Sequence, residues 1–446
     1  MNASLIVVAV LLCIVFVVGA GCTANRPWRT NYAHYDPAKV GQNSPTNVIE
    51  YQTNYDLGFV EFDEQGWFWD PGQLRFVEEM IRRDADIGQT TNAAGIVMLV
   101  FVHGWQDNAA SDNEKVGMVR QVLAQISDLE SGNPHPRKVV GVYCGWRGMS
   151  MTIPIINDLT FWSRKNTAYK VGGYGAMTEL LVTLEHLQQA SNDALPTNAP
   201  RTELIIVGHS FGAQAVYSAI SQIVAERFVD TIKEGQVLKP LGDQVILLSP
   251  AFEASRYFDL NQLAISIHEY PTNQRPVLSI FTSEGDWATH YVFPIGRFFS
   301  TLFQRNRDAD QRKAGREAVG WYETFVTHDL KYKMPTATAA ASGTNGVSTF
   351  NFATGKHELH NRHQLHLSAE NIRLQRAKWH PNNKTPATYD FDDAILEPKQ
   401  TFRPGDPLLV VSVDKKIMSG HDDINNPVLI NFLENYILFC EKDSQK

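Results

Sequence analysis

The stretch Leu204-Ile-Ile-Val-Gly-His-Ser-Phe-Gly-Ala-Gln-Ala-Val216 places a Gly-x-Ser-x-Gly pentapeptide between an apolar run and a run of small residues. A serine that attacks a carbonyl must project clear of the backbone on a sharp strand-to-helix turn. That turn crowds the positions two residues before and two after the serine, so glycine is needed at Gly208 and Gly212. The pattern predicts that Ser210 is a nucleophile on such a turn.

Strands and helices are expected to alternate on both sides of this turn. Continuous apolar runs predict strands that are buried on both faces, and apolar residues at helical spacing predict the helices between them. The alternation predicts a mostly parallel central sheet covered by helices. We expect a hairpin over 51–70, strands over 96–102, 138–144, 203–207, 244–249, 277–281 and 407–413, and helices over 71–83, 112–130, 173–190, 211–227, 254–265 and 426–439.

At Gly208–Gly212 the chain resembles the α/β-hydrolase superfamily, in particular its serine esterases and lipases. The resemblance implies the α/β-hydrolase fold, and a nucleophile, an acid and a histidine base in that chain order. The family usually keeps its acid just after a strand that follows the nucleophile, which implies Asp286. Glu284 is the nearest alternative carboxylate, and Glu253 is a second.

The base is implied on the loop between the last strand and the last helix, where the sequence has His421. His290 is the alternative. Upstream, His103-Gly104-Trp105 follows the apolar run 95–102 and is similar to the oxyanion loop of lipases. The resemblance implies that the backbone N–H groups of Trp105 and Phe211 bind the oxyanion. We expect a structural role for the His103 side chain.

The overall charge and the motif content exclude several other classes of function. The formal net charge of −8 argues against binding to a phosphate backbone, which needs a concentrated basic face. The sequence contains no phosphate-binding or dinucleotide-binding glycine motif, so we expect neither nucleic acid nor a cofactor. His357, His360, His363 and His366 recur every third residue, and this spacing cannot converge on one ion in a regular element. We therefore predict no metal site.

The first 22 residues are expected to be an export leader. The run Leu5–Val18 is continuously apolar, and it is followed by Gly19-Ala20-Gly21 and Cys22. A cysteine after such a run resembles the lipidation site of bacterial lipoproteins, which implies attachment to a membrane of the cell envelope through Cys22. One alternative is an uncleaved transmembrane anchor, since 3–22 is long enough to span a bilayer and Arg26 and Arg29 follow it. The other is a secreted protein that is released in full.

The remaining chain is expected to form one domain with a large insertion. Residues 23–50 are polar and are expected to be a linker, and 51–446 to be the hydrolase domain. Residues 287–405 interrupt the strand-helix alternation and are expected to form a cap or lid, with Phe298, Phe299, Leu302 and Phe303 on one helix face. Cys144 and Cys440 are expected to be free thiols.

These features together predict a serine hydrolase that cleaves small-molecule or lipid esters through an acyl-enzyme. The ester preference rests on the resemblance, because acyltransferases and amidases of the superfamily use the same triad. The alternative from another class is a non-catalytic hydrolase-fold lipoprotein that acts as a binding module.

Overall fold

A computed structural model describes residues 23–85, 94–150, 154–234, 236–267, 269–333, 345–351, 356–362, 369–379, 387–399 and 402–441. The expected leader, with Cys13 and the predicted lipidation site Cys22, lies outside these ranges. Within them, no helix combines the length and the hydropathy needed to span a bilayer. Two of the four regularly spaced histidines, His363 and His366, lie outside them as well.

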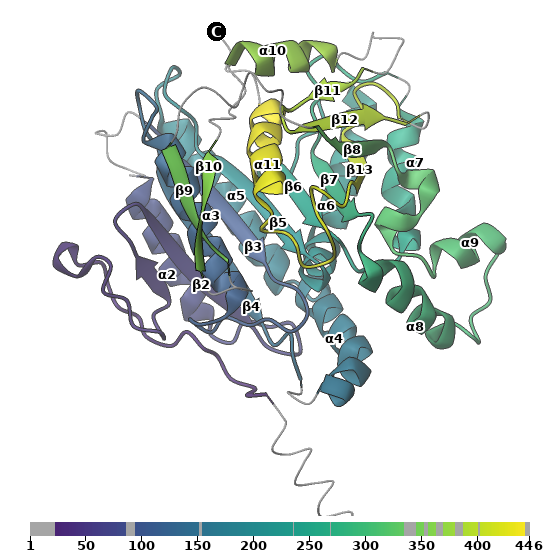
Figure 1. Cartoon of the computed structure of the whole chain (residues 1–446), viewed down its shortest axis with the longest axis horizontal. Helices are drawn as coiled ribbons and strands as arrows, with labels where there is room; N and C mark the ends of the chain where they lie inside the picture. The colour runs from purple at the N-terminus through teal and green to yellow at the C-terminus, as the bar shows by residue number, and fades with distance from the viewer. Residues whose placement is uncertain are drawn as a thin grey trace, which may run out of the picture.

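A sheet of eleven strands runs through the centre of the described chain (Figure 1). Its order is β1-β2-β4-β3-β5-β6-β7-β13-β8-β12-β11, and neighbours from β2 to β8 pair in parallel, while β1, β12 and β11 pair antiparallel with their neighbours. Because parallel strands need long crossovers, helices lie between them. The strands are β1 (Ile49–Tyr51), β2 (Tyr55–Phe62), β3 (Ile96–Val102), β4 (Lys138–Trp146), β5 (Glu203–His209), β6 (Gln244–Leu248), β7 (Leu278–Ser283), β8 (His328–Tyr332), β11 (Tyr389–Asp390), β12 (Ala394–Pro398) and β13 (Leu408–Val413).

Helices cover both faces of this sheet, as the continuous apolar strands require. Every residue of β3 is buried, and its side chains alternate between two separate apolar cores. One core packs against α2, α4, α5, α6 and α7, and the other against α3 and α11 (Figure 1). The helices are α2 (Pro71–Asp84), α3 (Glu114–Glu130), α4 (Pro154–Gly173), α5 (Ala176–Ala194), α6 (Phe211–Glu234), α7 (Phe258–Ser266), α8 (Phe293–Ser300), α9 (Ala309–Ala314), α10 (Ala369–Lys378) and α11 (Pro427–Cys440).

In the parallel core between β2 and β7, the predicted order of elements agrees with the structure apart from one added helix. Each predicted strand of the parallel core is present, with ends that differ by a few residues. The helix α4 was not predicted, because its apolar residues lack a clear helical spacing in the sequence. The predicted hairpin is only partial: β2 turns at Gly66, whose φ is +83°, and returns as a single bridge between Phe62 and Phe68. Cys144 and Cys440 are buried free thiols, as expected.

Residues 23–50 are not a linker, and this prediction is wrong. Arg29 is buried, and its guanidinium contacts the Glu50 carboxylate at 2.7 Å and the Ala109 carbonyl at 2.7 Å. The segment ends in β1, which pairs with β2. Its charged residues suggested solvent exposure, but they satisfy one another inside the domain, which the sequence does not reveal.

The interpretation of 287–405 as one cap is wrong as well. Its strands β8, β12 and β11 extend the central sheet beyond β13. The buried side chains of Leu330, Tyr389 and Leu396 belong to the same core as α11, so this part of the insertion completes the sheet's apolar cover. Residues 345–351 and 356–362 form a separate two-stranded sheet, β9 and β10 (Asn345–Asn351 and Lys356–Arg362). Helices α8 and α9 follow β7 and lie outside the sheet, at the lower right of Figure 1.

Candidate active site

Ser210 sits on a strained turn between β5 and α6. Its φ of +55° lies in the left-handed region, which non-glycine residues rarely adopt. A Cβ atom at Gly212 would lie 2.1 Å from the Val102 carbonyl oxygen, and one at Gly208 would lie 2.7 Å from the Ala213 Cα. These approaches are too close for any side chain, so both glycines of the pentapeptide are needed to hold the serine in this position.

The structure brings Ser210, His421 and Asp286 together in one chain of hydrogen bonds. His421 Nε2 lies 2.7 Å from Ser210 Oγ, and His421 Nδ1 lies 2.8 Å from Asp286 Oδ2. With the imidazole neutral, Nδ1–H donates to the carboxylate, and Nε2 accepts the serine hydroxyl. This arrangement can remove the serine proton during attack on an electrophile.

The loop that carries His421 packs closely against the loop that carries Asp286. A Cβ atom at Gly285 would lie 2.1 Å from the Ser419 carbonyl oxygen, so only glycine allows the two loops this close approach. The Ser283 hydroxyl donates to the Met418 carbonyl. On the other side of the acid, Thr289 donates to both Asp286 oxygens, through its backbone N–H at 3.0 Å and its hydroxyl at 2.6 Å. These contacts fix the carboxylate before any substrate binds.

The charges of the acid and the base stabilise each other. Burial alone would lower the pKa of His421, but the Asp286 carboxylate outweighs it and holds that pKa above its usual value. Burial alone would raise the pKa of Asp286, but His421 and the hydrogen bonds from Thr289 hold it below its usual value. Asp286 is therefore ionised at neutral pH, and its charge would favour the imidazolium that His421 forms on taking a proton from Ser210.

The alternative acids and bases lie elsewhere. Glu253 is buried in an ion pair with Lys165 at 2.8 Å and with Arg297 at 3.0 Å. Glu284 is exposed. His290 stacks on Trp321, with the ring centroids 3.7 Å apart. In the described chain, the carboxylate that contacts His421 Nδ1 is thus that of Asp286.

Two backbone amides beside Ser210 fit the predicted oxyanion site. The N–H of Gln106 donates to the Gly148 carbonyl, and that of Ser210 donates to the Leu248 carbonyl. By contrast, the N–H groups of Trp105 and Phe211 donate to no atom of the described residues. Gly104 packs against the nucleophile, since a Cβ there would lie 2.8 Å from Ser210 Cβ.

His103 holds this loop and takes no part in the hydrogen-bond chain, as expected. Its Nδ1–H donates to the Gly104 carbonyl at 2.9 Å, and its Nε2 accepts the Trp146 N–H at 3.0 Å. The ring stacks on Trp146 and is fully buried, and burial lowers its pKa to about 4. It is therefore neutral at working pH.

His209, within the pentapeptide itself, is a residue whose role the sequence analysis missed. Burial lowers its pKa to about 3, so the ring is neutral, and its Nε2–H donates to the backbone carbonyl of His421 at 2.9 Å. Strand β5 thereby supports both the nucleophile and the loop of the base. No sequence signal distinguishes this histidine, because the contact joins residues far apart in the chain.

A metal centre finds little support among the described residues. His209, His421 and Asp422 place ligand atoms within 4.8 Å of one another. Both ring nitrogens of His421 are already hydrogen-bonded to Ser210 and Asp286, and the Asp422 side chain is 76 % exposed. These three residues therefore do not form a preorganised site for a resident ion.

Comparisons with known proteins agree with the architecture. A model of a family described as alpha/beta hydrolase of unknown function (DUF900) matches residues 177–297, which include Ser210 and Asp286. None of the curated proteins searched matches the chain. One solved structure is a Trichoderma reesei cutinase in complex with a C11Y4 phosphonate inhibitor. It is 13 % identical, the match covers 48 % of this chain and 75 % of the cutinase, and the TM-score of 0.19 supports no further argument. From the sheet and the family model together, the chain has the α/β-hydrolase fold.

Replacing His209 tests whether it positions the base. We expect His209→Phe to slow the labelling of Ser210 by a fluorophosphonate about tenfold, because a buried hydrogen bond worth about 1.4 kcal/mol is lost. His209→Gln should recover part of the rate, since its amide can donate to the same carbonyl. Labelling reactions that are quenched at successive times give the rates of the two variants. Equal rates for the phenylalanine variant and the unchanged chain would contradict this role.

Proposed function

We propose that the protein is a serine hydrolase that cleaves carboxylic esters through an acyl-enzyme. The observation that carries the proposal is the continuous chain of hydrogen bonds from Ser210 Oγ through the His421 ring to Asp286, built on a strained turn. A structural serine would need neither the strain nor the buried carboxylate. The expected substrates are small-molecule or lipid esters, and no cofactor is required.

The geometry supports the following sequence of steps. Ser210 Oγ attacks the ester carbonyl while His421 Nε2 takes its proton, and the amides of Trp105 and Phe211 bind the oxyanion. The tetrahedral intermediate collapses, His421 returns the proton to the leaving alcohol, and the acyl group stays on Ser210. A water molecule then attacks the acyl carbonyl and gives its proton to His421. Release of the carboxylic acid returns the proton to Ser210.

The same residues would also serve an acyltransferase or an amidase, and these differ only in the nucleophile or the leaving group. A distinct alternative is a binding module that keeps the fold without catalysis. The buried, ionised Asp286 argues against that alternative, because burying a carboxylate costs stability and gives a binding module nothing in return. We therefore retain ester hydrolysis.

We also propose that the protein is attached to a membrane of the cell envelope through its N-terminal segment. The support is the apolar run Leu5–Val18 and the cysteine that follows it. Lipidation of Cys22 is the form we favour, and a single transmembrane anchor is the alternative. Thr23, the first described residue, donates its backbone N–H to the Ser150 carbonyl, so the attached segment would start directly at the folded domain.

A fluorophosphonate probe tests the nucleophile. We expect the probe to label the protein at Ser210, and we expect Ser210→Ala to remove the label and to lower ester turnover by a factor on the order of 10⁵ to 10⁶. Ser249→Ala is the matched control, because this buried serine directly follows the neighbouring strand β6, and the variant should retain labelling. A folded protein that takes up no label at all would favour the binding module.

The pH dependence tests the acid. Asp286 raises the pKa of His421. The acidic limb of the profile, where kcat/KM rises with pH, should therefore have its midpoint above the usual histidine pKa of 6.5. Asp286→Asn removes the charge that favours the imidazolium. The limb should therefore move to lower pH, and kcat should fall by about 10⁴.

Glu284→Gln is the control for this experiment, since its exposed carboxylate lies two residues away and should leave the limb in place. A limb that moves with Glu284→Gln, and stays with Asp286→Asn, would show that the wrong carboxylate has been assigned.

A further inference from the structure

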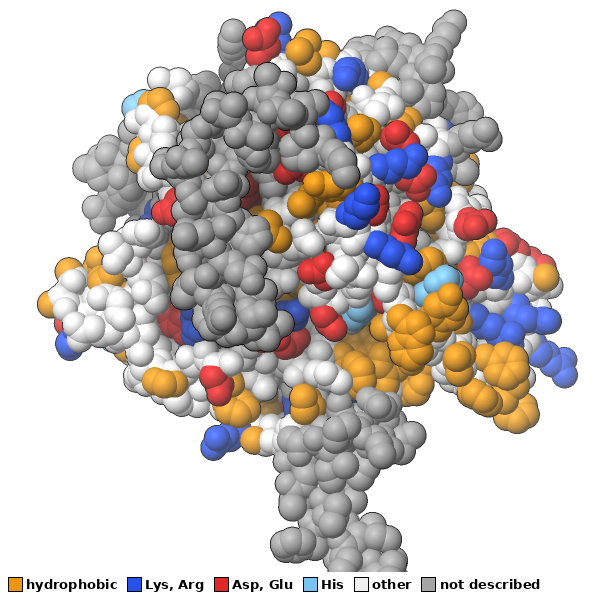
Figure 2. Space-filling model, in the orientation of Figure 1, with side chains coloured by type: hydrophobic (Ala, Val, Ile, Leu, Met, Phe, Trp, Pro, Cys, Tyr) orange, Lys and Arg blue, Asp and Glu red, His pale blue; other side chains and the backbone are white. Residues whose placement is uncertain are grey.

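An apolar surface follows Asp286 directly along the chain. Trp287, Tyr291, Ile295, Phe299 and Phe303 recur every fourth residue, and between 50 and 99 % of each side chain is exposed, Phe303 the most. We call these five residues the α8 surface; they run from the turn after Asp286 along α8 to the turn that follows it. Figure 2 shows the apolar side chains gathered on this part of the molecule. A soluble monomer rarely exposes such a continuous patch without a partner for it.

The opposite side of the same segment is anchored in the domain, so the surface is presented rigidly. Phe293 and Thr289 are buried, and Gly296 lies against the Trp162 ring, where a Cβ would overlap it at 1.7 Å. Arg297 reaches inward to the Glu253 carboxylate at 3.0 Å. The aromatic side chains are therefore exposed on a segment whose opposite side is packed in the domain.

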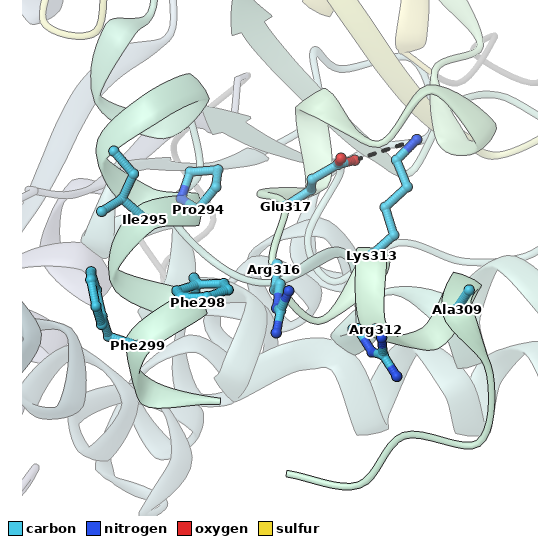
Figure 3. Close-up of a pocket in the computed structure, with 9 residues that line it drawn as sticks. All are labelled: Pro294, Ile295, Phe298, Phe299, Ala309, Arg312, Lys313, Arg316 and Glu317. Atoms are coloured by element: carbon cyan, nitrogen blue, oxygen red, sulfur yellow. Dashed lines mark ion pairs between the residues drawn. The ribbon is translucent and has the colours of Figure 1, made fainter. Parts of the chain in front are cut away.

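Cationic side chains border the α8 surface. Residues 293–317 contain six Arg or Lys and three Asp or Glu, whereas the whole chain has 40 basic and 48 acidic residues. Between α8 and α9 lies a hollow of about 670 Å³, with Ile295 and Phe298 on one wall and Arg312 and Arg316 on the other (Figure 3). An apolar wall facing a cationic wall fits an acyl chain with an anionic head group.

The N-terminal attachment lies at the same edge of the sheet. Thr23 is hydrogen-bonded to two residues that follow β4. Arg147 Nη2 donates to the Thr23 carbonyl at 2.8 Å, and the Thr23 N–H donates to the Ser150 carbonyl at 3.0 Å. Asp286 and α8 follow β7, which runs parallel to β4 within the sheet. The first described residue therefore lies at the edge of the sheet where the α8 surface emerges.

We propose that the α8 surface docks on the surface of an anionic lipid bilayer, with its aromatic residues in the interface and the neighbouring arginines on the lipid phosphates. Aromatic residues favour the interfacial region, and each juxtamembrane cation adds attraction to anionic lipid. Docking in this way turns the carboxyl edge of the sheet, with Ser210, toward the membrane. The inference concerns attachment alone and holds whether or not Ser210 is catalytic.

Hydroxyl-radical footprinting of the full-length chain tests the proposal. The chain is reconstituted in vesicles of phosphatidylcholine alone or of phosphatidylcholine with phosphatidylglycerol, so that the leader holds it equally in both. Leu302 and Leu374 form a matched pair, with 50 % and 52 % of their side chains exposed. Leu374 lies on α10, which contacts the far end of α11 through Arg376. We expect oxidation of Leu302 and Phe303 to fall several-fold in the anionic vesicles, while that of Leu374 stays constant.

Charge and apolar variants separate the two parts of the interaction. Arg305→Glu with Arg312→Glu should abolish the protection by anionic lipid, and both side chains are exposed, so the fold should be kept. Phe303→Ser should weaken the protection about tenfold, as loss of one interfacial aromatic side chain implies. Equal oxidation of Leu302 in the two kinds of vesicle would overturn the proposal. Protection that appears in detergent and grows with protein concentration would overturn it in favour of a second copy of the chain.

Discussion

The parallel sheet is the constraint on which the rest of this structure depends. Strands that run in the same direction end at the same edge, so the loops after β3, β5, β7 and β13 meet there although they lie far apart in the chain. Trp105 follows β3, Ser210 and Phe211 follow β5, Asp286 follows β7, and His421 follows β13, so all the residues of the proposed site meet at this edge. The attachment of Thr23 and the α8 surface lie at this edge too. Chemistry and membrane contact can therefore share one side of the domain.

Specific contacts fix the positions of the loops that meet at this edge. Asp286 is almost fully buried, yet it stays ionised because His421 and Thr289 satisfy its oxygens. His209 ties the loop of the base to the strand of the nucleophile, and the approach of Gly285 to the base loop leaves no room for a side chain. The site is thus rigid before substrate arrives, which is the condition for strong stabilisation of an oxyanion.

The sequence predicts the parallel core well, since buried parallel strands are short apolar runs bounded by turn residues. It also indicates Ser210 through the Gly-x-Ser-x-Gly turn, whereas Asp286 and His421 are implied by the resemblance to α/β-hydrolases. It fails where long-range contacts decide the outcome. Arg29 resembles a linker residue until its buried partner Glu50 is known. The strands β8, β11 and β12 are too short and too mixed in character to be recognised. In the structure β8 pairs with β13, β12 pairs with β8, and β11 pairs with β12.

A crystal structure of the full-length chain after reaction with a phosphonate ester would test the central claim most directly. The account predicts a covalent bond from Ser210 Oγ to phosphorus, with the phosphoryl oxygen about 3 Å from the backbone nitrogens of both Trp105 and Phe211. His421 should remain hydrogen-bonded to Asp286. An adduct on another residue, or a phosphoryl oxygen that faces away from both amides, would contradict the account.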